Sequence, residues 1–154
     1  MSAPAQSDGA AIRHAGLIAA RLGGFWRGVL IQGPAGAGKS DLALRALQQG
    51  FVLAADDRVL LWACAGRLFG RAPDTLQGRL EVRGVGVVTL AALPFAEVAL
   101  VARCGPAERI PEPSFAEFLG VCVPCLDVDP REPSAPAKLR RALSHFDLGG
   151  KRRI

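Results

Sequence analysis

Three observations predict that this sequence folds as an α/β domain with a mixed sheet and flanking helices. Half of its 154 residues are hydrophobic, which is enough to bury a core within one domain. Short apolar runs typical of buried strands occur at 29–31 and 51–55. Apolar residues at helical spacing follow Asp41 and again Ser134, and they predict two helices. No repeat or second domain is visible, so we expect one domain.

The first half of the chain predicts a strand, a turn, a strand and a helix in that order. Residues 12–20 predict a first strand, which contains His14. Gly23 and Gly24 then predict a turn into the strand that ends at 29–31. The helix that begins near Asp41 should end near Gly50, because glycine is a common C-terminal cap residue.

The second half of the chain predicts mainly strands. A buried strand at 51–55 is followed by two extended runs within 59–69, separated by an alanine and a glycine, which indicates a hairpin. Residues 80–88 alternate between polar and apolar types and include two glycines, and 98–102 predict a further strand. Three prolines within 105–113 indicate an irregular loop.

A glycine-rich loop stands between the strand at 29–31 and the helix that follows it. It has the pattern G-x-x-x-x-G-K-S, the phosphate-binding P-loop, formed by Gly33, Pro34, Ala35, Gly36, Ala37, Gly38, Lys39 and Ser40. Glycines let successive backbone N–H groups form a nest for an anion, and the helix N-terminus adds positive potential. Lys39 can reach the outer phosphates, and the Ser40 hydroxyl can bind the Mg²⁺ that accompanies a nucleotide. The loop therefore predicts binding of a nucleoside triphosphate such as ATP, together with Mg²⁺.

Two adjacent aspartates end the strand at 51–55, one strand–helix–strand step after Lys39. A phosphoryl-transfer enzyme uses acidic residues to hold Mg²⁺ or to take a proton from the attacking hydroxyl. Neighbouring residues on a strand point to opposite faces, so we expect only one of Asp56 and Asp57 to meet the phosphates directly. The alternative interpretation of this pair is a solvated turn.

Glu81 and Arg83 are two residues apart, so on a strand they would share one face. The Glu81 carboxylate could complete a magnesium shell, and the Arg83 guanidinium could stabilise charge on a transferred phosphoryl group. The alternative is an ion pair on the surface.

Composition argues against several other classes of protein. The net charge is +5, but the arginines are scattered and no aromatic residues lie among the basic groups, so we do not expect nucleic acid binding. No apolar run reaches about eighteen residues and the start lacks the features of a secretory signal, so we expect no membrane span and a cytoplasmic location. The four cysteines lack the spacing of a zinc site and are expected to be buried, reduced thiols; the alternative is a redox role for the pair Cys122 and Cys125.

The P-loop, the Asp-Asp pair with Ala55 before it, and the segment 80–87 together resemble the catalytic domain of the HPr kinase/phosphorylase family. His14 is similar to a histidine that this family carries before its P-loop. The family fold resembles the nucleotide-binding half of phosphoenolpyruvate carboxykinase. Its members transfer phosphate from ATP or pyrophosphate to a serine of the phosphocarrier HPr, many also remove it, and they typically form hexamers.

The resemblance implies a role for each matching residue. Lys39 would contact phosphate, Ser40 and Glu81 would bind Mg²⁺, and His14 would lie next to the reacting groups. One of Asp56 and Asp57 would act as general base, and we favour Asp57. The short length resembles a form that lacks the N-terminal domain. An arginine-containing loop that longer members use for dephosphorylation is not recognisable after residue 121, so the resemblance gives little support for phosphorylase activity.

We therefore predict a tail at 1–11, a P-loop catalytic domain at 12–148 and a basic tail at 149–154. The predicted function is an ATP- and Mg²⁺-dependent serine kinase for an HPr-like phosphocarrier, as a homo-oligomer. One alternative is a small-molecule P-loop kinase, which would usually need an arginine-bearing lid; the loop at 105–113 has only Arg109. The other is a non-catalytic module that senses ATP.

Overall fold

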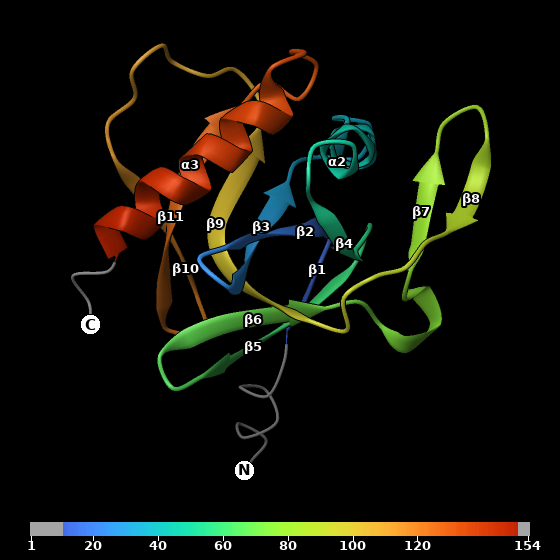
Figure 1. The fold of residues 1–154 in the computed structure, drawn as a ribbon, viewed down its shortest axis with the longest axis horizontal. Helices are drawn as coiled ribbons and strands as arrows, with labels where there is room; N and C mark the ends of the chain where they lie inside the picture. The colour runs from blue at the N-terminus through green and yellow to red at the C-terminus, as the bar shows by residue number, and fades with distance from the viewer. Residues whose placement is uncertain (1–10, 151–154) are drawn as a thin grey trace.

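A curled, nine-stranded sheet dominates the computed structural model, which describes residues 11–150 (Figure 1). Along its main path the strand order is β1-β5-β6-β9-β3-β2-β4, and β11 joins at β9 and carries β10. The strands of this sheet are β1 (Ala11–Arg13), β2 (Ala15–Leu22), β3 (Phe25–Gln32), β4 (Val52–Ala55), β5 (Val59–Cys64), β6 (Arg67–Arg71), β9 (Ala96–Cys104), β10 (Ser114–Phe118) and β11 (Val121–Val128).

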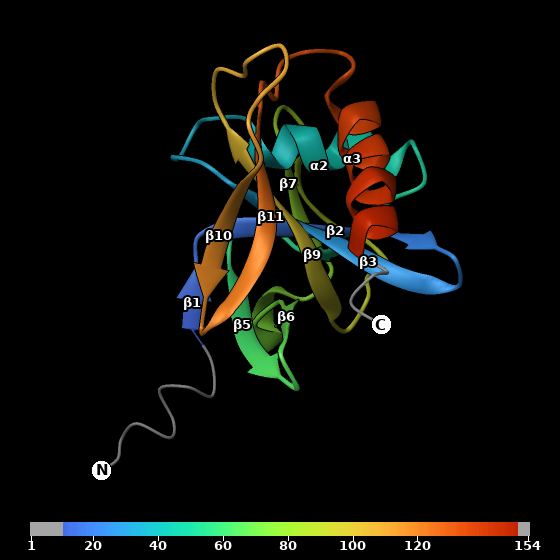
Figure 2. The same cartoon turned by 90° about the vertical axis from the view of Figure 1, so that its left-hand side faces the viewer.

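Two helices cover one face of this sheet, as the perpendicular view in Figure 2 shows. They are α2 (Lys39–Leu47) and α3 (Ala135–Gly150). Buried leucines of both helices pack against central strands, whereas the opposite face packs against the curled outer strands. Because both faces of the sheet are covered, β2 and β3 are almost continuously apolar rather than alternating. The predicted α/β fold with a mixed sheet and flanking helices is confirmed.

The first predicted strand is in fact two strands. β1 pairs with β5, whereas β2 pairs with β3 and β4, and the chain bends at His14 between them. The single strand predicted for 12–20 is therefore wrong at His14, because the two segments have different partners. The hairpin predicted within 59–69 is present as β5 and β6, with its turn at Ala65 and Gly66.

The segment predicted as one alternating stretch at 80–88 is a separate two-stranded ribbon. It consists of β7 (Arg79–Val82) and β8 (Gly86–Thr89), joined by a tight turn, and it follows a short 3-10 helix, η1 (Asp74–Leu76). Gly84 and Gly86 have φ angles of 88° and 127°, which other residues rarely adopt, and this lets the chain reverse. Leu80 anchors the ribbon in the core beneath the helices.

Strand direction determines where the loops meet. β3, β9 and β11 are parallel, and β4 runs the same way because β2 is antiparallel to both β3 and β4. The carboxyl ends of these four strands therefore lie along one edge of the sheet, the usual place for ligands in α/β folds. Of the predicted tails, only Ala11, in β1, and residues 149–150, in α3, lie within the described residues.

Candidate active site

The predicted P-loop connects β3 to α2 at this edge. Gly36 and Gly38 have φ angles of 82° and 105°, so the turns of the loop depend on glycine. Gly33 also allows close packing, since a Cβ atom there would lie 3.0 Å from Cβ of Cys104. Helix α2 begins at Lys39, directly after the loop, and directs its positive end there. Loop and helix together have the form of an anion-binding site.

Lys39 bonds to the backbone of its own loop. Its Nζ donates to the carbonyl oxygens of Gly33 at 2.6 Å and Pro34 at 3.0 Å. Among the side chains of residues 11–146 no carboxylate forms an ion pair with Lys39. Its positive charge is therefore available to an anion that enters the loop.

Asp56 links the P-loop to the β7–β8 ribbon. The Ser40 hydroxyl donates to its Oδ1 at 2.7 Å, and the backbone N–H of Glu81 donates to its Oδ2 at 3.2 Å. Burial raises the pKa of Asp56; the two hydrogen bonds lower it, and the nearby Asp57 and Glu81 carboxylates raise it further. The Asp57 and Glu81 carboxylates thus lie within electrostatic range of Asp56, and Asp56 itself contacts Ser40.

Asp57 has a different environment from Asp56. Its side chain is 69% exposed, and Arg58 Nε lies 3.9 Å from its Oδ2. Its φ angle of 73° turns the chain, and its carbonyl oxygen accepts the N–H of Ala15 at 3.2 Å. That bond brings the bend at His14 beside Asp57, and the His14 side chain is exposed. The structure therefore places His14 and Asp57 on neighbouring segments, both open to solvent.

Glu81 and Arg83 do not share a strand face as predicted. Glu81 lies on β7, and its backbone contacts Asp56, but β7 ends at Val82 and Arg83 lies in the exposed turn to β8. Among the ion pairs within the described residues, none joins Glu81 to Arg83. Glu81 therefore lies next to Asp56, whereas Arg83 lies in the turn at the exposed end of the ribbon.

The oxygen donors near Ser40 suit a hard cation that arrives with a nucleotide. Within the part of the chain that the structure describes, no group of three or more His, Cys, Asp and Glu side chains could hold a metal ion alone. Mg²⁺ in phosphoryl-transfer sites normally uses only one or two protein carboxylates, together with the P-loop hydroxyl, and completes its shell with phosphate oxygens and water. The Ser40 hydroxyl with the Asp56 and Glu81 carboxylates fits that pattern.

A cavity of about 420 Å³ adjoins the P-loop. Residues 104–106, which follow or end β9, and 129–131, which follow β11, line it together with Gly36 and Ala37. None of the residues 104–106, and neither Asp129 nor Pro130, was predicted as a site residue. The one usable signal was the position of Asp129 at the end of a strand, but β11 itself was not predicted, because Pro124 interrupts its sequence.

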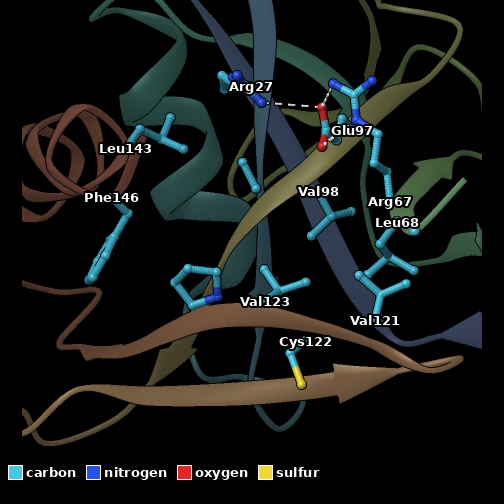
Figure 3. A pocket seen from close by; sticks show the side chains of 13 residues that line it. Arg27, Arg67, Leu68, Glu97, Val98, Val121, Cys122, Val123, Leu143 and Phe146 are labelled. Carbon is cyan, nitrogen blue, oxygen red and sulfur yellow. Dashed lines mark hydrogen bonds and ion pairs between the residues drawn. The ribbon is translucent and has the colours of Figure 1, made fainter. Parts of the chain in front are cut away.

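A second pocket, of about 170 Å³, lies near the amino ends of β3 and β9 (Figure 3). Figure 3 shows the Glu97 carboxylate between the side chains of Arg27 and Arg67. Glu97 Oε1 accepts from Arg27 Nη1 at 3.2 Å and from Arg67 Nη2 at 3.0 Å, while Arg67 Nε donates to Oε2 at 3.2 Å. These charges largely satisfy one another. The pocket lies at the opposite end of the parallel strands from the P-loop.

Two further predictions from composition can be compared with the structure. All four cysteines are free, but the prediction that they are buried is wrong for Cys64 and Cys122, which are exposed; Cys125 is buried and Cys104 is partly buried. In the described residues, no helix combines the length and the apolar character needed to cross a membrane.

Comparison with known proteins identifies the family. The family model for the HPr Serine kinase C-terminal domain matches residues 14–99. The HPr kinase/phosphorylase of Mycoplasmopsis pulmonis is 42% identical over 66 residues, which are 43% of this chain and 21% of that protein. The enzyme of the same name from Streptococcus thermophilus is 46% identical over 70 residues, which are 45% of this chain and 23% of that protein. The matched segment therefore spans about a fifth of these relatives.

A solved structure extends the similarity to nearly the whole chain. The Hpr(Ser) kinase/phosphatase from Coxiella burnetii superposes with a TM-score of 0.76 over 92% of this chain and 99% of that chain, at 23% identity. At that identity the comparison supports the fold. The family model itself covers more than half of the residues, and the chain therefore belongs to the HPr serine kinase C-terminal domain family.

Proposed function

We propose that this protein is an ATP- and Mg²⁺-dependent serine kinase that phosphorylates an HPr-like phosphocarrier. The main supporting observation is the connection from Ser40 of the P-loop through Asp56 to Glu81, which brings acidic groups to the phosphate-binding loop. Membership of the family supports HPr as the kind of substrate. The four free cysteines are consistent with a cytoplasmic location. Assembly into a homo-oligomer stays a prediction.

The P-loop would hold the donor phosphates. In this proposal the backbone N–H groups of the loop and Lys39 bind the outer phosphates, so Lys39 exchanges its bonds to Gly33 and Pro34 for phosphate oxygens. Ser40, Asp56 and Glu81 would hold Mg²⁺, which when bound neutralises charge on the phosphates. Asp56 would act directly or by orienting the Ser40 hydroxyl.

Asp57 is the better candidate for the general base. Both carboxylate oxygens of Asp56 accept hydrogen bonds from within the protein, whereas the Asp57 side chain is largely exposed and can meet a substrate hydroxyl. In the proposed step the serine oxygen attacks the γ-phosphorus, its proton passes to Asp57, and the bond from the γ-phosphorus to the bridging oxygen breaks to release ADP. Atoms and charge balance without a further reactant.

His14 and Arg83 would act at the rim of this site. His14 is exposed on the segment that bonds to Asp57, so it can contact the substrate serine or the transferred phosphoryl group. Arg83 lies in the turn of the β7–β8 ribbon. From that exposed turn it would stabilise charge on the phosphoryl group only when the bound phosphocarrier brings the ribbon towards the P-loop.

The experiment that tests this proposal is phosphorylation of an HPr-like protein from the same organism. The purified kinase is incubated with ATP, Mg²⁺ and the phosphocarrier, and intact mass and fragment spectra are recorded. We expect one added phosphate on a serine, which is lost with the Lys39→Ala variant and without Mg²⁺. Lys138→Ala is the matched control, since that exposed lysine pairs with Glu132 and should be dispensable.

Other outcomes would identify the alternative functions. ATP binding with no transfer to any phosphocarrier would contradict the kinase proposal and favour a sensor module. Transfer to a small metabolite in place of the phosphocarrier would favour the small-molecule kinase.

A further inference from the structure

The guanidinium group of Arg45 joins helix α2 to the connection between β11 and α3, residues 129–134. Its Nη2 donates to the carbonyl oxygen of Pro130 and its Nη1 to that of Glu132 at 3.2 Å, across 85 and 87 residues of the chain. Its Nε donates to the Asp41 carboxylate at 3.0 Å, one turn earlier on α2. The side chain is only 29% exposed. Because all three of its nitrogen atoms donate, the planar group is held in one orientation.

Pro130 is the residue through which this connection reaches the P-loop. It is buried, and a Cβ atom placed on Gly38 would lie 3.6 Å from both Cβ and Cγ of its ring. Gly38 is the N-cap residue of α2 and has a φ angle of 105°, and as a glycine it offers no side chain to cap the helix. The last turn of the P-loop, directly before Lys39, therefore lies against the Pro130 ring.

The connection is itself ordered and anchored. The N–H of Glu132 donates to the carbonyl oxygen of Asp129 at 3.2 Å, and the N–H of Ala135 donates to that of Glu132 at 3.0 Å, so consecutive turns lead into α3. Leu139, in the first part of α3, is fully buried in the core. Arg45 therefore ties the helix that follows the P-loop to a segment whose position is fixed by the core.

The place at which these bonds act gives them a bearing on ligand binding. A P-loop receives phosphate through backbone N–H groups that must converge on one point. In such sites a displacement of about 1 Å can cost about a hundredfold in rate. Gly36 and Gly38 have positive φ angles and leave the loop conformationally free. A contact from outside the loop limits that freedom, and the Pro130 ring makes one at Gly38.

We propose that Arg45 is a positioning residue for the P-loop. By holding the Pro130 carbonyl it keeps the Pro130 ring against Gly38, and so fixes the backbone that receives the phosphates. The inference rests on the proposed function only in so far as the P-loop binds phosphate. Arg45 acts through Pro130 and does not touch the phosphates itself, so its loss weakens phosphate binding in a chain that still folds.

Calorimetric titration of inorganic tripolyphosphate with Mg²⁺ into the whole chain tests the inference, at a temperature at which circular dichroism shows each variant folded. Arg45→Ala removes the bonds to the connection, and we expect it to bind tripolyphosphate about tenfold more weakly than wild type. The matched control is Arg71→Ala. Arg71, on β6, also donates to a backbone carbonyl and to an aspartate, but β6 pairs with the amino end of β9, away from the P-loop. Its affinity should equal that of wild type.

Further variants separate the contact from the charge. Asp41→Asn removes the ion pair within α2 and leaves both carbonyl acceptors of Arg45, so its affinity should stay within about twofold of wild type. Pro130→Gly removes the ring but no charge, and keeps the carbonyl that Arg45 holds. It should weaken binding about tenfold, as Arg45→Ala does. In the double variant the loss should be no larger than in either single variant, because both substitutions break one link.

The results distinguish failure of the inference from failure of the proposed function. Wild-type affinity in Arg45→Ala or in Pro130→Gly would overturn the positioning role while the P-loop function survives, and Pro130→Gly alone decides this should Arg45→Ala not fold. Losses that multiply in the double variant would show that the two residues act separately, which also contradicts the link. If wild type itself binds no tripolyphosphate, the proposed function fails, and the inference fails with it.

Discussion

The two ends of β3 and β9 carry charged groups in opposite states. At the amino ends, Glu97 accepts hydrogen bonds from Arg27 and Arg67, and its side chain is only 16% exposed. At the carboxyl ends, Lys39 bonds only to backbone carbonyls of its loop as far as the side chains of residues 11–146 are described, and Asp56 has a raised pKa. Glu97 thus has cationic partners at one end, whereas at the other end the ion pairs among the described side chains include neither Lys39 nor Asp56.

This difference indicates that the charged cluster at the amino ends is structural, whereas the charged residues at the carboxyl ends form a binding site. Charges that satisfy one another hold strands in place and have little to offer a ligand. A charged side chain that has no partner of opposite charge in the protein can bind an anion or cation from solution. The comparison therefore predicts that substitutions at the amino ends affect stability, whereas substitutions at the carboxyl ends affect binding and transfer.

The largest expected effect is that of Lys39→Ala on phosphoryl transfer. Removal of the cation that would contact the outer phosphates should lower the transfer rate by about a thousandfold. The free energy of unfolding should change by less than about 1 kcal/mol, because Lys39 has no ion pair to lose within the described residues. Radiolabel transfer from ATP and urea denaturation measure the two quantities. A large loss of stability would make Lys39 a structural residue.

Asp57→Asn should lower transfer by about a hundredfold or more while ATP binding is kept. Asparagine tolerates the left-handed conformation, so the φ angle of 73° should not cost the fold. Single-turnover assays with ATP binding measured in parallel test this, and Asp74→Asn, an 89% exposed carboxylate on η1, is the control. Full activity in Asp57→Asn would show that Asp57 is not the general base, and Asp56 would then be the remaining candidate.

Glu97→Ala should show the reverse pattern. It leaves two arginines, one of them largely buried, without their shared carboxylate, and should lower the free energy of unfolding by about 3 kcal/mol. The matched control is Glu117→Ala on the exposed side of β10, which should cost less than about 0.5 kcal/mol. The ATP affinity of folded Glu97→Ala should equal that of wild type. A weaker affinity would mean that the charged cluster at the amino ends contributes to ATP binding at the carboxyl ends.

The smallest expected effect is a pH dependence of stability from Asp56. Because burial raises its pKa above the ordinary value near 3.8, the folded state holds this proton more tightly than the unfolded state. The free energy of unfolding of wild type relative to Asp56→Asn should therefore fall as pH rises from about 4 and become constant above the raised pKa. Urea denaturation at several pH values measures the difference. A difference that grows with pH would mean that the hydrogen bonds from Ser40 and Glu81 outweigh burial.

The local parts of the site could be predicted from the sequence. The P-loop is a continuous sequence pattern, and its own glycines adopt the positive φ angles that its turns require. The hairpin of β5 and β6 is formed by two strands that are adjacent in the sequence. The strand ending in Asp56 is also local, and its position one step after the loop predicted that one of Asp56 and Asp57 would meet the phosphates. The structure shows that Asp56 is the one whose carboxylate contacts Ser40 of the P-loop; whether either aspartate meets a phosphate stays a prediction.

The parts that depend on distant partners could not be predicted. The bend at His14 arises because β1 and β2 pair with different strands, and nothing local marks that change. Glu97 and Arg27 are 70 residues apart. Asp129 and Arg131 line the cavity because β11 pairs with β9. Strand β11 was not predicted, because Pro124 lies within it and proline is rare inside strands. Long-range pairing, rather than local propensity, places these residues.

The most direct test of the contrast between the two ends is a calorimetric titration of Mg²⁺–ATP into wild type, Lys39→Ala and Glu97→Ala, each at a temperature where the protein is folded. The account predicts one site per chain in wild type and in Glu97→Ala, with the same affinity, and no detectable binding to Lys39→Ala. Binding retained by Lys39→Ala, or lost in Glu97→Ala, would contradict it.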